Sequence, residues 1–209
     1  MPSNRNIARS LQSATNRLLN LVQERRLIRS AEVEEAGATR QHLARLVARG
    51  LIVRHGRGLY GCADADVTED HSLAEVCKRV PHGVVCLLSA LRFHDLGTQL
   101  PSQVWLAVPR SAWRPRFDNL RLRLVFLPDA ALRRSVETHV IEGVSVGVFS
   151  AARTVADCFK FRSKVGVDVA IEALRELRRL NLATSDELWC EARHCRVGNV
   201  MRPYMEAIL

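Results

Sequence analysis

The residues with the strongest potential for catalytic chemistry in this sequence are Arg153, Thr154 and Asp157, which fall in one predicted helix. A carboxylate beside an arginine would suit metal-dependent cleavage or nucleotide transfer on a nucleic acid. Arg153 and Asp157 stand four residues apart, however, and this is the spacing of a common stabilising ion pair along a helix. We therefore expect a structural pair. A nucleic-acid-processing enzyme built on this cluster is the least favoured of the alternatives.

Other catalytic patterns do not occur in the sequence. His94 and Asp95 are neighbours in a predicted helix, where adjacent side chains point about 100° apart and cannot face each other as an acid–base dyad. The chain has three lysines, Lys78, Lys160 and Lys164, and none sits in the Glu-x-Lys arrangement of a restriction-type nuclease. No Gly-x-Ser-x-Gly elbow, P-loop lysine or His-Glu-x-x-His helix occurs either. We expect that the protein is not an enzyme.

The cysteines give little sign of metal binding. Six are scattered along the chain without a Cys-x-x-Cys pair, mostly among apolar neighbours. Such cysteines are typical of a reduced core, so we expect no disulfides. Cys190, His194 and Cys195 could supply three zinc ligands, but no fourth ligand follows at a finger-like spacing. We expect neither a metal nor a cofactor.

The positive charge is concentrated at one end of the chain. Residues 1–60 contain 11 Arg and 4 acidic residues, a net charge of +7, whereas residues 61–209 contain 20 basic and 18 acidic residues, a net charge of +2. A concentrated positive field favours binding to a polyanion, because each neutralised phosphate releases condensed counterions. The alternative is a solvated basic surface.

The first fifty residues have the layout of a helix-turn-helix. Apolar residues at three- and four-residue spacing, Leu11, Ala14, Thr15, Leu18, Leu21 and Val22, predict an amphipathic helix over about 9–27. Ser30 can cap a short helix over 31–36, and Gly37 supplies the positive φ of a sharp turn. Thr39 then caps a third helix, which runs to Arg49 and ends at Gly50. In this layout the third helix enters the major groove of DNA.

The helical wheel of the third helix assigns its faces. We expect Leu43, Leu46 and Val47 to face the core, which directs Gln41 and Arg45 outward. Arginine can bind guanine and glutamine can bind adenine with two hydrogen bonds each, so we expect Arg40, Gln41 and Arg45 to read base edges. The full set of residues expected to bind DNA, including those of the hairpin described next, is Thr39, Arg40, Gln41, His42, Arg45, Arg49, Arg54 and Arg57.

A β-hairpin follows directly after the third helix. Residues 51–54 and 59–62 are predicted strands, and the turn between them is His55-Gly56-Arg57-Gly58. We expect the two glycines to allow close approach to a phosphate backbone, with Arg54 and Arg57 supplying charge. The segment therefore predicts the wing of a winged helix-turn-helix.

The rest of the chain predicts an α+β body: a mixed or antiparallel sheet domain with a C-terminal helical cap. Strands are expected at 84–88, 103–108, 120–126, 136–141 and 144–149, a short helix capped by Ser89, and further helices from Ser150 onward. The acidic stretch 64–70 looks like a linker, so we divide the chain into a DNA-binding domain, 1–64, and an α+β domain, 65–209. A second cationic cluster, Arg110, Arg114, Arg116, Arg121 and Arg123, could contact DNA or an acidic partner, or could be a solvated strand face.

No segment looks like a membrane span or a secretory signal. The longest apolar runs are far shorter than the roughly 18 residues that a membrane span needs. The N-terminal segment is interrupted by Gln12, Asn16, Arg17 and Asn20, and so lacks the apolar core of a signal peptide. We expect a cytoplasmic protein.

Six short motifs along the chain are shared with a known family. The N-terminal motifs are Gly37-x-Thr39-x-x-x-Leu43-x-x-Leu46-Val47-x-x-Gly50 and Arg54-x-x-Arg57-Gly58-x-Tyr60. The body adds Ser89-Ala90-Leu91-x-x-His94-x-Leu96, Pro101-x-x-Val104-Trp105, Ser150-x-x-Arg153-Thr154-Val155-x-Asp157 and Val200-Met201-Arg202-Pro203-Tyr204. With these motifs the sequence resembles the AbiEi antitoxins of type IV toxin–antitoxin systems. The resemblance implies a repressor that binds repeats in its own promoter and opposes a co-encoded nucleotidyltransferase toxin. It also implies a non-enzymatic protein.

The residues and the resemblance together predict a sequence-specific double-stranded DNA-binding antitoxin and autorepressor. The main alternative is a free-standing winged-helix transcriptional regulator without a toxin, whose body senses a ligand or binds a partner. An adjacent nucleotidyltransferase gene would favour the first hypothesis, and a lone gene would favour the second.

Overall fold

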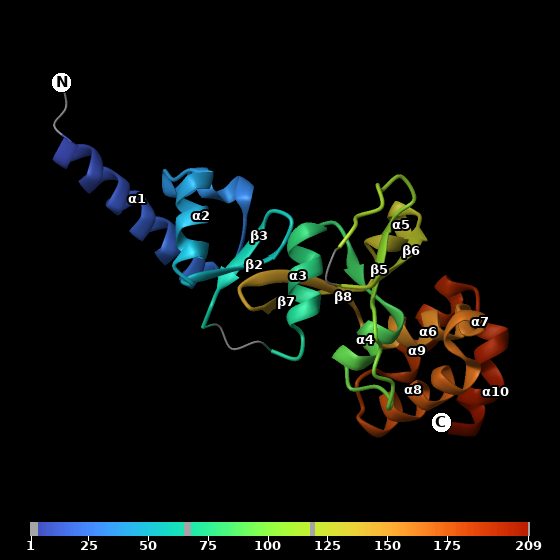
Figure 1. Ribbon diagram of the computed structural model, residues 1–209. Coiled ribbons are helices and arrows are strands. Elements are labelled where there is room, and N and C mark those ends of the chain that lie inside the picture. The colour runs from blue at the N-terminus through green and yellow to red at the C-terminus, as the bar shows by residue number, and fades with distance from the viewer. Residues whose placement is uncertain (1–3, 65–67, 118–119, 209) are drawn as a thin grey trace. The chain divides into compact units, whose positions relative to one another are not determined.

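The computed structural model describes residues 4–64, 68–117 and 120–208, and the side chains from residue 13 onward (Figure 1). The chain forms two compact units. The first comprises residues 1–81 together with 115–120 and 140–146, and the second comprises residues 82–114, 121–139 and 147–209. The expected boundary at 64/65 lies at the edge of residues 65–67, which are outside the described residues, and it stays a prediction.

The first unit begins with the predicted helix-turn-helix. Helix α1 (Asn4–Arg25) is followed by a 3₁₀ helix, η1 (Ser30–Ala36), and by helix α2 (Arg40–Ala48). Gly37 has φ 61°, the left-handed conformation that the turn between η1 and α2 requires. Ala14, Leu18 and Val22 of α1 are buried against the apolar residues of η1 and α2. The expected periodicity of α1 is confirmed at these positions, while the side chain of Leu11 is outside the described residues.

A three-stranded antiparallel sheet completes this fold. The hairpin of β2 (Ile52–Gly56) and β3 (Leu59–Cys62) matches the predicted wing. Strand β1 (Leu27–Arg29) was not predicted; it pairs with β3 on the side opposite β2, with Ile28 facing Tyr60 in register. The predicted extension of α1 to residue 27 is wrong, because Arg26 adopts a left-handed φ of 57° and ends the helix.

Helix α3 (His71–Arg79) belongs to the same unit and packs against β1. Lys78, near its end, donates a 2.8 Å hydrogen bond to Glu32 of η1. Arg25, at the end of α1, donates to the same carboxylate at 3.0 Å. Glu32 therefore joins three helices of the unit through ion pairs.

Most of a mixed sheet lies in the second unit, as predicted, while residues 140–146 of its last hairpin belong to the first unit. The strands are β4 (Val84–Val85), β5 (Val104–Pro109), β6 (Leu122–Leu127), β7 (Val136–Ile141) and β8 (Val144–Phe149), in the order β6-β5-β4-β8-β7. Strand β5 runs parallel to β6 and antiparallel to β4, and β4 runs parallel to β8. Residues 104–108 of β5 are all buried, as expected of a strand inside a sheet.

One predicted strand is largely a helix. The apolar run 84–88 contributes only Val84 and Val85 to the sheet, and helix α4 (Leu87–Phe93) begins immediately after it. Ser89 is inside α4 and does not cap it; its hydroxyl accepts a 2.9 Å hydrogen bond from the backbone N–H of Trp105. A short apolar run has no period that distinguishes a buried strand from a buried helix.

The C-terminal helices form the predicted cap. They are α6 (Ala151–Lys160), α7 (Arg162–Val165), α8 (Val167–Arg179), α9 (Ser185–Cys195) and α10 (Gly198–Ile208), and a short helix, α5 (Asp129–Leu132), precedes β7. Helix α6 is buried along nearly its whole length and packs against α4, α8 and α9. None of the helices in the described part of the chain is long and apolar enough to span a membrane.

Candidate nucleic-acid interface

The start of α2 is fixed by its own residues. Thr39 has extended backbone angles, φ −123° and ψ 168°, which place it at the N-cap. Its backbone N–H donates a 3.0 Å hydrogen bond to Nδ1 of His42, one turn into the helix. The carbonyl of Thr39 accepts hydrogen bonds from the N–H groups of His42 and Leu43. These contacts set the direction in which α2 leaves the turn after Gly37.

The exposed face of α2 carries most of the predicted contact residues. Arg40, Gln41, Arg45 and Arg49 are exposed, and so is Thr39 at the N-cap. Leu43 and Leu46 are buried, as predicted. The polar and cationic side chains of the helix therefore face solvent.

Two residues of α2 exchange the roles expected of them. His42 was predicted to flank the DNA-facing side, and this is wrong: the side chain is only 5% exposed and bonds the helix cap. Val47 was predicted to face the core but is 37% exposed. The buried stripe is thus centred on His42, Leu43 and Leu46. At about 100° per residue the outward face centres on Gln41, with the exposed Ala44 and Ala48 beside it.

The wing places both of its predicted arginines in solvent. Arg57 lies in the two-residue turn between β2 and β3, and Arg54 is exposed on β2, where its Nε donates a 3.1 Å hydrogen bond to the carbonyl of Gly56. Side-chain atoms lie beside the position that a Cβ on either glycine would take, and the expected close approach of the glycines to a phosphate backbone stays a prediction. A Cβ on Gly56 would lie 2.0 Å from Nη2 of Arg79, and one on Gly58 would lie 3.1 Å from Oγ of Ser30.

The segment formed by α2 and the wing carries positive charge without acidic residues. Residues 39–62 contain five arginines, at 40, 45, 49, 54 and 57, and no Asp or Glu. Within the described part of the chain, none of these arginines forms an ion pair. By contrast, Arg25 and Lys78 of the same unit both pair with Glu32. The uncompensated positive charge therefore gathers on α2 and the wing.

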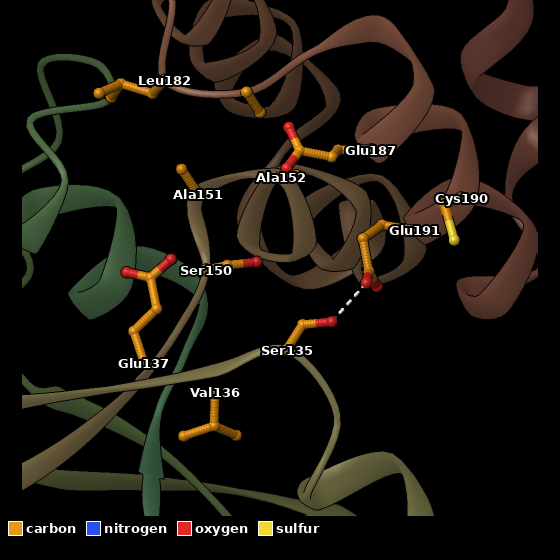
Figure 2. Close-up of a pocket in the computed structure, with 11 residues that line it drawn as sticks. Ser135, Val136, Glu137, Ser150, Ala151, Ala152, Leu182, Glu187, Cys190 and Glu191 are labelled. Atoms are coloured by element: carbon orange, nitrogen blue, oxygen red, sulfur yellow. Dashed lines mark hydrogen bonds between the residues drawn. The ribbon is translucent and has the colours of Figure 1, made fainter.

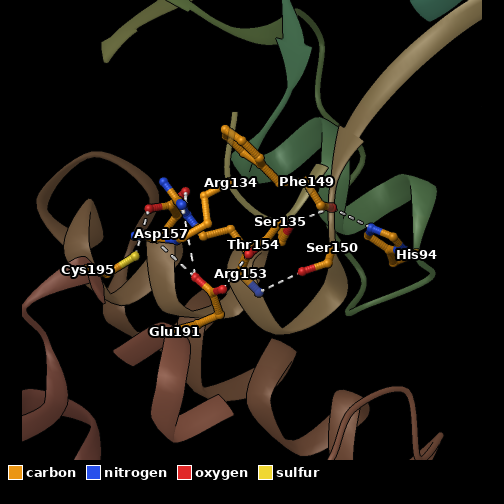
Figure 3. A network of polar contacts seen from close by, with 10 residues as sticks. All are labelled: His94, Arg134, Ser135, Phe149, Ser150, Arg153, Thr154, Asp157, Glu191 and Cys195. Atoms are coloured by element: carbon orange, nitrogen blue, oxygen red, sulfur yellow. Dashed lines mark hydrogen bonds and ion pairs between the residues drawn. The ribbon is translucent and has the colours of Figure 1, made fainter. Parts of the chain in front are cut away.

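Arg153, Thr154 and Asp157 of the second unit are buried, and their hydrogen bonds join elements of the fold (Figure 3). Arg153 and Asp157 are 1% and 2% exposed, and Nε of Arg153 donates a 2.8 Å hydrogen bond to Asp157. Thr154 donates to the carbonyl of Phe149, and the same carbonyl lies 2.8 Å from Nε2 of His94. These contacts join α6 to β8 and α4, and they use His94 as a hydrogen-bonding partner of the backbone.

Glu191 of α9 extends this network. Its carboxylate accepts hydrogen bonds from Ser135 and Arg134, and it lies 3.9 Å from Nη1 of Arg153. The thiol of Cys195 donates to Asp157 at 3.3 Å. Although burial lowers the pKa of the Arg153 guanidinium, the negative charges of Asp157 and Glu191 outweigh this effect and raise it, which keeps the buried arginine charged.

A cavity of about 340 Å³ lies beside the network, between the start of β7, the N-terminus of α6 and α9 (Figure 2). Glu137, Glu187 and Glu191 contribute carboxylates to its lining. Glu187 accepts hydrogen bonds from the N–H and hydroxyl of Thr184 and thereby caps α9, and Glu191 is bonded as described above. Two of the three carboxylates are thus already occupied by structural hydrogen bonds.

Two arginines of the second cationic cluster stack on aromatic rings. The guanidinium of Arg123 lies 4.7 Å from the centre of the Trp105 ring, and that of Arg114 lies 5.4 Å from the centre of the Phe126 ring. Such contacts are ordinary cation–π packing on a strand face. Arg110, Arg116 and Arg121 are exposed, and their expected contact with DNA or a partner stays a prediction.

Four of the six cysteines are buried, as the apolar neighbours predicted. Burial raises the pKa of Cys77 to about 12, and burial together with the charge of Asp157 raises the pKa of Cys195 to about 12. Cys190 and His194 face each other on α9, with Sγ 3.6 Å from Nδ1.

Sequence reasoning missed one cluster of metal-binding residue types. His55 of β2 and His71 and Glu75 of α3 place their donor atoms within 4.8 Å of one another. The i, i+4 spacing of His71 and Glu75 was a signal that the two share one helix face. Nothing in the sequence indicated that His55 would lie beside them.

Comparison with known proteins supports the resemblance for the N-terminal segment. Residues 16–61 match the family model described as "Transcriptional regulator, AbiEi antitoxin". The match spans the described end of α1, η1, α2 and the wing, so this part of the chain has the sequence features of a DNA-binding regulator. The resemblance to AbiEi antitoxins is confirmed here, while the motifs of the body lie outside the matched residues.

The fold also matches a solved structure. The Rv2827c protein of Mycobacterium tuberculosis has a TM-score of 0.56 with 14% sequence identity, over 94% of this chain and 80% of that one. At this identity the likeness concerns the α+β architecture alone. A search of curated proteins gave no match.

Proposed function

We propose that this protein is a sequence-specific double-stranded DNA-binding regulator that inserts α2 into the major groove. The observation that carries the proposal is the segment of α2 and the wing, where five arginines gather without an acidic residue or an ion pair among the described residues. Unpaired cations on an exposed helix face and hairpin suit the phosphates on either side of a groove. The match of residues 16–61 to the AbiEi regulators supports the same assignment.

The exposed face of α2 suggests how bases are read. Gln41 lies at the centre of this face, and its amide can form two hydrogen bonds with adenine. Arg40 and Arg45 lie on either side of it, and each guanidinium can form two hydrogen bonds with guanine. The small side chains of Ala44 and Ala48 allow the helix to approach closely and can contact thymine methyl groups. Arg49, Arg54 and Arg57 then bind the phosphate backbone and fix the register of the helix.

The AbiEi family match suggests a biological role. We propose that the protein represses its own promoter and opposes a co-encoded nucleotidyltransferase toxin. We also propose that it is not an enzyme, because the best catalytic candidates, Arg153 and Asp157, are buried and bonded to each other. Co-expression with an adjacent nucleotidyltransferase gene tests the antitoxin role, and loss of growth arrest is the expected result.

DNA binding can be tested by fluorescence anisotropy of the full chain with its own upstream DNA and with a scrambled duplex, over a series of salt concentrations. Specific binding should be tighter and should weaken steeply with salt. Arg45→Ala should cost about 1–3 kcal/mol on the specific duplex and relax base preference. Arg57→Ala should weaken both duplexes and reduce the salt slope by about 1.

The matched control is Arg175→Ala, which removes an exposed arginine from α8 of the other unit. It should leave both affinities unchanged. Equal binding of wild-type protein to both duplexes would contradict sequence-specific regulation. Unchanged binding by Arg45→Ala and Arg57→Ala would contradict the assignment of α2 and the wing.

A further inference from the structure

His55, His71 and Glu75 place three potential metal ligands close together. Nδ1 of His55 and Nε2 of His71 lie 3.3 Å apart, and the carboxylate of Glu75 is within 4.8 Å of both. Two imidazole nitrogens on a tetrahedral zinc ion, each at about 2.0–2.1 Å, would be separated by about 3.3 Å. All three side chains belong to the first unit, and two come from one face of α3.

A carboxylate outside the cluster orients one of the imidazoles. Nδ1 of His71 lies 2.7 Å from Glu142, whose side chain is 4% exposed. Glu142 is itself held by hydrogen bonds of 2.9 and 2.8 Å from the N–H and hydroxyl of Thr68. A carboxylate that accepts from Nδ1 leaves the Nε2 lone pair of His71 directed toward His55, which is the carboxylate–histidine arrangement found behind many metal ligands.

The other ring is fixed by close packing. Nε2 of His55 lies against Gly61 of β3, where an added Cβ would approach to 2.7 Å. This contact positions the ring so that Nδ1, its other nitrogen, faces His71. The glycine thus makes room for an imidazole that points into the cluster.

The surrounding charges suit a divalent cation. Glu75 is 1% exposed, and Glu142 brings a second carboxylate to the same side of α3. Arg79 forms an ion pair with Glu75, with Nη2 3.8 Å from Oε1, and a bound cation would share this carboxylate with it. The guanidinium of Arg79 stacks on Phe117, 4.6 Å from the ring centre.

We propose that His55, His71 and Glu75 bind one divalent transition-metal ion, zinc being the best fit to two imidazoles and a carboxylate. Because His55 lies between Arg54 and Arg57 in the β2–β3 hairpin, the ion joins the wing to α3. Its effect on DNA affinity rests on the proposed function, whereas the metal site itself does not.

The site is tested first without DNA. Full-length protein freed of metal with a chelator is titrated with Zn²⁺ in competition with a chromophoric chelator, and with Co²⁺ followed by its visible absorption. Wild-type protein should bind one equivalent. His55→Ala and Glu75→Gln should abolish that binding, and Glu142→Gln, which keeps all three ligands, should weaken it about 10- to 100-fold.

Two controls exclude other sites. His82→Ala removes an exposed histidine outside the cluster, and Cys190→Ser removes the thiol that faces His194. Both should bind zinc as the wild type does. Zinc should also raise the unfolding midpoint of the wild type and of both controls but leave that of His55→Ala unchanged. Equal zinc affinity in wild type and His55→Ala, or no binding by wild type, would overturn the proposal.

The consequence for the wing is measured separately, as the affinity for upstream DNA with and without zinc. Zinc should tighten binding about five-fold or more in the wild type and not in His55→Ala. Zinc binding at the cluster without any change in DNA affinity would overturn the role in the wing. If the protein fails to bind DNA at all, the proposed function falls, while the zinc titration still decides whether the site exists.

Discussion

Replacing Asp157 by alanine should destabilise the second unit severely, because it leaves a buried arginine without its partner. Arg153 is 1% exposed, and its 2.8 Å hydrogen bond to Asp157 is the shortest contact of its guanidinium. Glu191, at 3.9 Å, is too distant to replace it. Breaking a buried ion pair by removing one partner costs about 3–5 kcal/mol. For a protein of this size the loss corresponds to a fall in the unfolding midpoint of about 6–20 °C.

The assay is thermal and urea denaturation followed by circular dichroism. The chain offers a matched control in the pair of Arg179 and Glu176 on α8, which has a similar separation of 2.7 Å but a 67% exposed arginine. Glu176→Gln should leave the midpoint nearly unchanged, because solvent screens such a pair. The comparison isolates burial as the cause, since both pairs lie on helices of the same unit.

A double variant, Arg153→Met with Asp157→Leu, refines the test. It removes both charges and should be less destabilising than Asp157→Ala alone, because no uncompensated charge is buried. The reasoning would be refuted if Asp157→Ala cost less than about 1 kcal/mol, or if the double variant were the less stable of the two. Nuclease or nucleotide-transfer activity that disappeared in a folded Asp157→Asn variant would instead revive the enzyme hypothesis.

Two further predictions follow from pKa values. Partial burial raises the pKa of Glu32, but its hydrogen bonds and the charge of Lys78 outweigh this effect and lower it. The stability that Glu32 provides is therefore present at neutral pH and is lost as the pH falls through its folded-state pKa. When the free energy of unfolding is measured over a series of acidic pH values, it should fall less steeply for Glu32→Gln than for the wild type. The thiols of Cys77 and Cys195, whose pKa values are raised to about 12 by burial, should resist iodoacetamide at pH 8 in native protein. The half-buried Cys62 and Cys190 should be alkylated before them. Mass spectrometry measures the order, and equal rates for the buried and half-buried thiols would contradict the burial.

The helix-turn-helix and wing were predictable because their signals are local. A cap at Thr39, a left-handed glycine at 37 and a two-residue hairpin turn each constrain only a few neighbouring residues. The periodicity of α1 also follows from its own sequence. These features therefore appear at or near the predicted positions.

The faces of α2 were less predictable. The wheel treated Val47 as core and His42 as surface, yet His42 is buried because its ring bonds the helix cap, and Val47 is left partly exposed. Hydrophobicity alone does not reveal that a polar side chain has a local partner. The expected set of DNA-contacting residues loses His42 for this reason, and its remaining members stay predictions.

Strand β1 and the helix α4 depended on contacts distant in the sequence. Leu27–Arg29 becomes a strand because β3, more than thirty residues later, offers an unpaired edge. Residues 84–88 divide between β4 and α4 at a point where the chain contacts β5: the N–H of Cys86 donates to the carbonyl of Trp105 at 3.1 Å, and the N–H of Trp105 donates to Ser89. Neither partner can be recognised from the segment itself.

The sequence by itself determined the DNA-binding module, since capping, glycine conformation, helical period and the lack of acidic residues in 39–62 are all properties of short segments. Only the tertiary structure decided what distant residues do together. It buried Arg153 against Asp157 and Glu191, and it gathered His55, His71, Glu75 and Glu142 from four separate positions into one cluster. The physical reason is that such sites depend on distances between side chains, which the packing of whole elements sets.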